Sequence, residues 1–173
     1  NIEKHHNKKD EATNKKNPVD KYPTDIWDYL HKNLPLIIKI LKKDPLEKME
    51  EKETIAILIC RDYISTIPSA LELFLRAIDW RNPFEVSIAH LYLKRWTPID
   101  GEDAVSLLDA RFPDTAVREY AVSRLRELPD EMISAYMLIL CQCLLYETFL
   151  VNPLADFLIE RSLMTPILLG NSF

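Results

Sequence analysis

Apolar residues recur at helical spacing along most of the chain, in segments separated by proline and aspartate. The clearest case lies within residues 112–147. One stripe with steps of three and four residues there consists of Val117, Tyr120, Ala121, Leu125 and Leu128. Charged residues occupy the other face, so this segment predicts an amphipathic helix, with Asp114 or Thr115 as its N-cap.

The next segment, residues 130–145, is apolar on all sides, which predicts a helix enclosed by its neighbours. Asp130 is positioned to cap it. Gln142 interrupts the run, and a membrane span needs about 20 apolar residues. The pattern therefore predicts a buried helix and no direct insertion into a membrane.

The same periodicity predicts further helices on both sides of this pair. They cover approximately residues 25–43, 50–63, 68–80, 83–96, 101–108 and 153–163. Short connections favour an antiparallel arrangement of successive helices. The starts of alternate helices are roughly 30–38 residues apart. This spacing predicts an all-α protein and, more specifically, an α-solenoid of stacked antiparallel HEAT-like helix pairs in a right-handed superhelix.

The chain divides into three parts by composition. Residues 1–22 are almost wholly polar and predict a disordered linker, because they cannot bury enough surface to offset chain entropy. His5 and His6 lie in this part, without the other ligands that a metal site needs. Residues 23–43 predict a helical lead-in, and residues 44–173 the main helical domain.

Composition narrows the class of protein further. A length of 173 residues fits one domain plus a tail, and a net charge of −5 argues against a nucleic-acid partner. Three cysteines in apolar helical segments predict reduced thiols in a cytoplasmic protein. With only two glycines, no glycine-rich phosphate loop is present. We find no nucleophile–base pair, so the sequence predicts no catalytic, cofactor-binding or metal-binding residue.

Asp114, followed by Val117 and Arg118, resembles the signature of HEAT repeats, in which the aspartate and arginine tie neighbouring units together. An ordinary helix cap beside a solvated arginine fits the same residues, and the sequence leaves both interpretations open.

Two longer strings are more distinctive. Trp96-Thr97-Pro98-Ile99 precedes Glu-Asp-Ala-Val-Ser-Leu-Leu at 102–108, and Val-Arg-Glu-Tyr-Ala-Val-Ser-Arg-Leu follows at 117–125. Together with Asp-Pro-Leu at 44–46 and Asp79-Trp80, they resemble the helical accessory domain of phosphoinositide 3-kinases. The resemblance covers about residues 44–173 and includes no catalytic motif.

The resemblance implies a non-catalytic scaffold of stacked helix pairs, against which the lipid-binding and kinase domains of a longer enzyme pack. Such an enzyme phosphorylates the 3-position of phosphatidylinositol lipids with ATP and magnesium, which bind in its kinase domain. The chain ends about where the family continues into that domain, so it resembles a fragment of a cytoplasmic enzyme that is recruited to membranes. Its expected partners are other domains of the same chain and a regulatory subunit.

The family resemblance also draws attention to Glu50, Glu51 and Glu53, because the acidic entry turn docks a regulatory subunit in some members. The hypothesis is a partner-docking patch, and the alternative is a solvated first helical turn favoured by the helix dipole. Lys48 stands among these acids and departs from the pattern.

Two other assignments compete with the 3-kinase domain. The equivalent domain of a phosphatidylinositol 4-kinase is one, although the Trp96-x-Pro98-Ile99 segment favours the 3-kinase. A free-standing HEAT-like adaptor is the other. Sequence downstream of Phe173 distinguishes the three.

Overall fold

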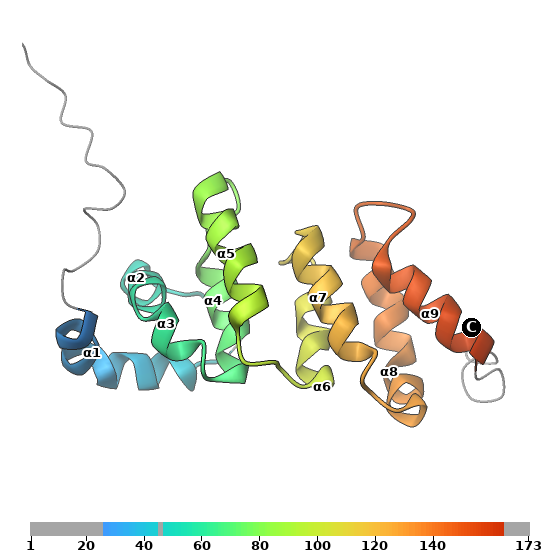
Figure 1. The fold of residues 1–173 in the computed structure, drawn as a ribbon, viewed down its shortest axis with the longest axis horizontal. Helices are drawn as coiled ribbons and strands as arrows, with labels where there is room; N and C mark the ends of the chain where they lie inside the picture. The colour runs from blue at the N-terminus through green and yellow to red at the C-terminus, as the bar shows by residue number, and fades with distance from the viewer. Residues whose placement is uncertain (1–25, 45–46, 165–173) are drawn as a thin grey trace, which may run out of the picture.

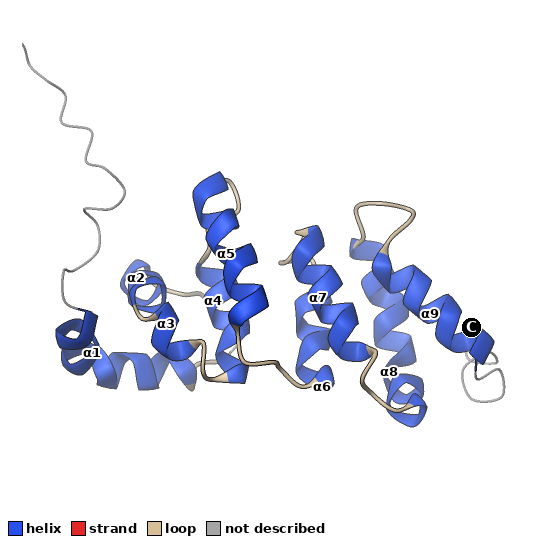
Figure 2. Cartoon of the chain, in the orientation of Figure 1, coloured by secondary structure: helices blue, strands red, loops and turns tan. Residues whose placement is uncertain are grey.

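Helices make up all the regular structure that is described. The computed structural model describes residues 26–44 and 47–164, and these residues contain no strand (Figure 2). The α-helices are α1 (Ile26–Leu41), α2 (Glu51–Ile59), α3 (Arg61–Ile64), α4 (Leu71–Ala77), α5 (Pro83–Arg95), α6 (Gly101–Ala104), α7 (Thr115–Leu125), α8 (Asp130–Cys143) and α9 (Pro153–Met164). Short 3-10 helices are η2 (Pro68–Ala70), η3 (Val105–Leu108) and η4 (Leu144–Tyr146). The all-α prediction is confirmed.

The helices follow one another along the longest axis of the molecule, from α1 at one end to α8 and α9 at the other (Figure 1). α2 contacts α1 and α4, while α7 contacts α5, α6 and α9. Buried side chains from α1 through α9 form one continuous apolar cluster. Residues 1–22, for which the sequence predicts a linker, lie outside the described part.

An aromatic cluster joins α4 to α5 in the middle of this core. The ring of Phe74, which is fully buried, lies 5.4 Å from that of Tyr92 and 5.1 Å from that of Trp96, measured between centroids. The Trp96 indole N–H donates to the carbonyl of Ile67 at 3.0 Å. The buried Trp96 ring therefore keeps a hydrogen-bond partner for its only polar group, as stable packing requires.

A polar side chain caps the start of α5 and of α7, whereas α3, α4, α6 and α8 have no side-chain cap. Asp114 caps α7, where its carboxylate accepts from the backbone N–H of Val117 at 3.1 Å, as expected. Asp130, by contrast, does not cap α8. It is the first helical residue, its side chain makes no capping bond, and it pairs instead with Arg161 of α9. A partner distant in sequence has replaced the local one.

The prediction that α8 is enclosed on all sides is wrong. Ile133, Met137 and Leu140 are buried, but Leu138 is 72% exposed and Ile139 46%. α8 lies near the end of the row of helices, so part of its apolar surface has no neighbour within the described residues (Figure 1). None of the described helices has the length and apolar character that crossing a bilayer demands.

Candidate functional site

Arg118 and the groups that it contacts, which we call the Arg118 framework, link α7 to η3 and to the end of α8. The Arg118 side chain is 3% exposed, and its guanidinium reaches the carboxylate of Glu147 at 2.8 Å. Further bonds from the guanidinium go to the carbonyls of Leu108, Phe112 and Cys143, at 3.1, 3.3 and 3.2 Å. Of the two interpretations that the sequence left open, the solvated arginine is therefore excluded.

The Arg118–Glu147 ion pair could not be predicted from the sequence, because the two residues are 29 positions apart. It ties α7 to the end of α8 and to the turn before α7. A buried charge must be paired and hydrogen-bonded to avoid a large desolvation cost, and Arg118 meets that need with four different groups. The arrangement positions helices, and it presents no reacting group to solvent.

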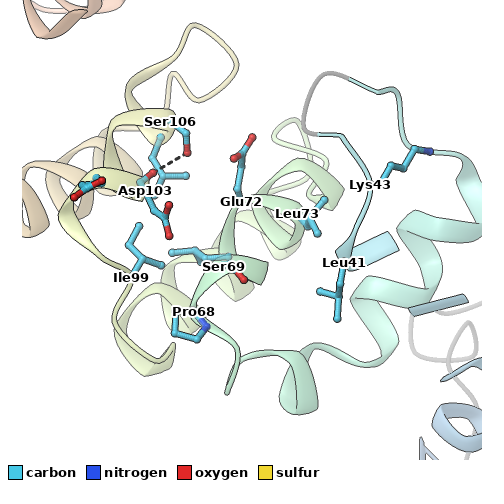
Figure 3. Close-up of a pocket in the computed structure, with 12 residues that line it drawn as sticks. Leu41, Lys43, Pro68, Ser69, Glu72, Leu73, Ile99, Asp103 and Ser106 are labelled. Atoms are coloured by element: carbon cyan, nitrogen blue, oxygen red, sulfur yellow. Dashed lines mark hydrogen bonds between the residues drawn. The ribbon is translucent and has the colours of Figure 1, made fainter. Parts of the chain in front are cut away.

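A cavity of about 350 Å³ lies between α4 and the α6–η3 segment (Figure 3). Leu41, Leu73 and Ile99 line it together with carboxylates. Two of these carboxylates are already engaged: Glu72 pairs with Arg111 at 3.2 Å, and Glu102 accepts from the Tyr136 hydroxyl at 3.2 Å.

Within the described residues, no three His, Cys, Asp or Glu side chains are grouped as a metal site would require. Cys60, Cys141 and Cys143 are free thiols. Burial raises the pKa of Cys60 and of Cys143 above the usual thiol value, which disfavours the reactive thiolate in both.

The three acidic residues proposed for docking differ in accessibility. Glu50 and Glu51 are exposed, but Glu53 is only 3% exposed. The Glu53 carboxylate accepts from Lys43 Nζ at 2.7 Å and from the Glu50 backbone N–H at 2.8 Å, the latter within a capping box at the start of α2. A partner would therefore meet Glu50 and Glu51, while Glu53 holds α2 to the end of α1. Docking itself stays a prediction.

The Glu53 contacts predict a pH dependence of stability. The hydrogen bond from Lys43, followed by that from the Glu50 backbone, lowers the pKa of Glu53 below its usual value of 4.5. Since the folded state has the lower pKa, this stabilisation is present above the unfolded-state pKa and is lost as pH falls through the folded-state value. We expect the free energy of unfolding, measured with urea, to fall on acidification below about pH 4.5.

Glu53→Gln isolates this contribution, since it cannot titrate. Its unfolding free energy is expected to be lower than that of the unsubstituted chain at pH 7, and the difference to shrink at pH 3. Glu51→Gln, on the same turn but exposed, serves as the control. A difference that is constant from pH 7 to pH 3 would contradict the role of the Glu53 carboxylate.

Exposed apolar side chains concentrate at the α8–α9 end of the molecule. Ten of the seventeen exposed large apolar residues lie within residues 138–164. The α8–α9 apolar residues, as we call the most exposed of them, are Leu138, Leu145, Phe149, Leu150, Val151, Ile159, Leu163 and Met164. Leu150 is 96% exposed and Leu145 82%. Exposed apolar surface is typical of protein–protein interaction sites, so this end of the molecule is the candidate interaction site.

These features define an all-helical domain with a continuous core and an apolar end. The model of the phosphoinositide 3-kinase family accessory domain (PIK domain) matches residues 29–173 of the chain. The chain belongs to this family. The match begins at residue 29, within α1, whereas the sequence motifs that resemble the family begin at residue 44.

Two curated relatives are phosphatidylinositol 3-kinases by name. Phosphatidylinositol 3-kinase 3 of Dictyostelium discoideum is 35% identical over 136 residues, which is 78% of this chain and 8% of the relative. Phosphatidylinositol 3-kinase pik3 of Schizosaccharomyces pombe is 37% identical over 134 residues, or 73% of this chain and 17% of the relative. The chain thus spans less than a fifth of the length of either.

Proposed function

We propose that this chain is the non-catalytic scaffold of a phosphoinositide 3-kinase and that the enzyme's lipid-binding and kinase domains pack against it. The observation that carries the proposal is the exposure of the α8–α9 apolar residues in a chain that belongs to the accessory-domain family. Burying Leu145 and Leu150 against another domain would contribute about 1.5–3 kcal/mol for each side chain.

The mechanism is positional. In this proposal the row of helices is a solenoid of HEAT-like pairs, and the buried Arg118 framework makes its second half rigid. A rigid surface holds two docked domains at a fixed distance and orientation. This positions the lipid substrate relative to the reacting groups of the kinase domain. The enzyme phosphorylates the 3-position of phosphatidylinositol lipids with ATP and magnesium. Those reactants bind in the kinase domain and not in this chain.

A regulatory protein with a basic surface is a further partner in this proposal, docking at the start of α2. Support comes from the exposure of Glu50 and Glu51 beside the helix N-terminus, where acidic side chains are favoured. Opposite charges on the partner would speed association and set its orientation more than they would raise affinity.

The test is a charged double variant, Leu145→Asp with Leu150→Asp, in the whole protein that the gene encodes. We expect at least about a tenfold loss of phosphatidylinositol phosphorylation in vesicles with ATP and magnesium, because two desolvated carboxylates would oppose domain packing. Both residues are exposed in the chain alone, so its own unfolding free energy should change by no more than about 0.5 kcal/mol per site.

Leu91→Asp on α5 is the matched control, since Leu91 is also exposed, at 51%, but lies away from the α8–α9 end. Equal activity of the double variant and this control would contradict packing through α8 and α9. Identification of the phosphorylated ring position in the product tests the 3-position assignment separately.

A further inference from the structure

A second cavity, the α2–α4 pocket, neighbours the first: Arg111 in its lining pairs with Glu72, which lines the first cavity. Its volume is about 350 Å³. The residues that line it are Lys48, Met49, Thr54, Arg76, Trp80, Arg111 and Phe112. Three of the seven are cations and none is acidic, in a chain whose net charge is −5. The lining of the pocket is therefore positively charged, although the net charge of the chain is negative.

The three cations differ in how far their charge is balanced. Arg111 contacts the carboxylates of Glu72 and Asp109, at 3.2 and 3.1 Å. Arg76 donates to the backbone carbonyl of Glu47, a neutral group. Within residues 26–44 and 47–164, neither Arg76 nor Lys48 has a carboxylate within 4.0 Å. Two charges are thus available to an anion.

Apolar surface completes the pocket. Trp80 and Met49 are half-buried and Phe112 is 1% exposed, so part of the lining is apolar. An inorganic ion would leave that surface uncovered. A ligand that combines an anionic group with an adjacent apolar group would use both kinds of lining.

We propose that the α2–α4 pocket binds an acidic peptide segment, with an Asp or Glu side chain on Arg76 and Lys48 and a neighbouring apolar side chain on Trp80. The fork of Arg76 matches a carboxylate, and clusters of basic side chains recognise acidic motifs in this way. The lining provides no helix N-terminus with open N–H groups, because the capping box occupies that of α2. That favours a carboxylate over a phosphate.

A peptide suits the pocket better than a free small molecule. The volume lies near the lower limit for small-molecule sites and accommodates about one or two side chains. Lys48 is exposed at the rim, so residues flanking the bound side chain would lie along the surrounding surface. This site is separate from the packing proposed for α8 and α9, because none of the α8–α9 apolar residues lines the pocket.

The test uses the 15N-labelled 173-residue chain and two capped hexapeptides, one of alternating Glu and Leu and one with Gln in place of Glu. The probe is the indole N–H resonance of Trp80, assigned with Trp80→Phe. We expect the Glu peptide to shift it and to leave the buried Trp96 indole unmoved. Arg76→Gln and Lys48→Gln should each weaken binding at least about threefold, and higher salt should weaken it too.

Arg81→Gln is the matched control, because the Arg81 side chain is 96% exposed and outside the pocket. Lys48→Gln keeps the test decisive if Arg76→Gln perturbs the fold, since the Lys48 side chain makes no ion pair within the described residues. Equal shifts with the Gln peptide would overturn the proposal. So would no shift with either peptide, or inorganic phosphate shifting Trp80 and displacing the Glu peptide.

Discussion

Replacing Arg118 with alanine is expected to lower the free energy of unfolding by about 3–5 kcal/mol. The change removes the buried cation but leaves the Glu147 carboxylate, whose side chain is 7% exposed, without its partner. Three backbone carbonyls also lose a charged donor. Urea denaturation followed by circular dichroism at 222 nm measures the loss.

Arg126→Ala is the matched control for this prediction. It also breaks an ion pair, with Glu160 of α9, but both side chains there are 44% exposed. Exposed pairs contribute about 0–1 kcal/mol. A loss for Arg118→Ala as small as that for Arg126→Ala would show that the framework does not hold α7 and α8 together.

Phe74→Ala is the second change for which we expect a large effect, again about 3–5 kcal/mol of unfolding free energy. Phe74 is fully buried between Tyr92 and Trp96, so the truncation leaves a cavity and removes two aromatic contacts. The Trp96 indole bond to Ile67 should survive, which keeps the helices in place around the cavity.

The same denaturation experiment on Phe84→Ala provides the comparison, because Phe84 is 59% exposed on α5. We expect that variant to lie within about 0.5 kcal/mol of the unsubstituted chain. If both phenylalanine variants lose equally little, the aromatic cluster is not part of a cooperative core.

The local features of this fold are those that the sequence predicts well. Helix periodicity and the Asp114 cap depend on residues within one or two turns of each other, so one sequence suffices to find them. Asp130 shows the limit: its neighbours in sequence predict a helix cap, but its carboxylate accepts from Arg161, 31 residues further on. Nothing in the local pattern distinguishes the two outcomes.

The candidate site depends still more on contacts distant in sequence. In the sequence, Glu53 is one of three similar acids. Its burial and its pairing with Lys43, two residues after the end of α1, are visible only in the structure. The apolar sequence of α8 predicts an enclosed helix, whereas Leu138 is 72% exposed because no described helix covers that side. Apolar surface that the fold leaves exposed has the same sequence pattern as apolar surface of a core.

Amide hydrogen exchange, compared between the isolated 173-residue chain and the whole protein, tests the scaffold role most directly. If other domains pack on α8 and α9, amides of residues 138–164 should exchange at least about tenfold more slowly in the whole protein, because docking suppresses local opening. Amides of α4, already buried in the chain alone, should exchange at similar rates in both. Identical exchange of residues 138–164 in the two samples would contradict the scaffold role.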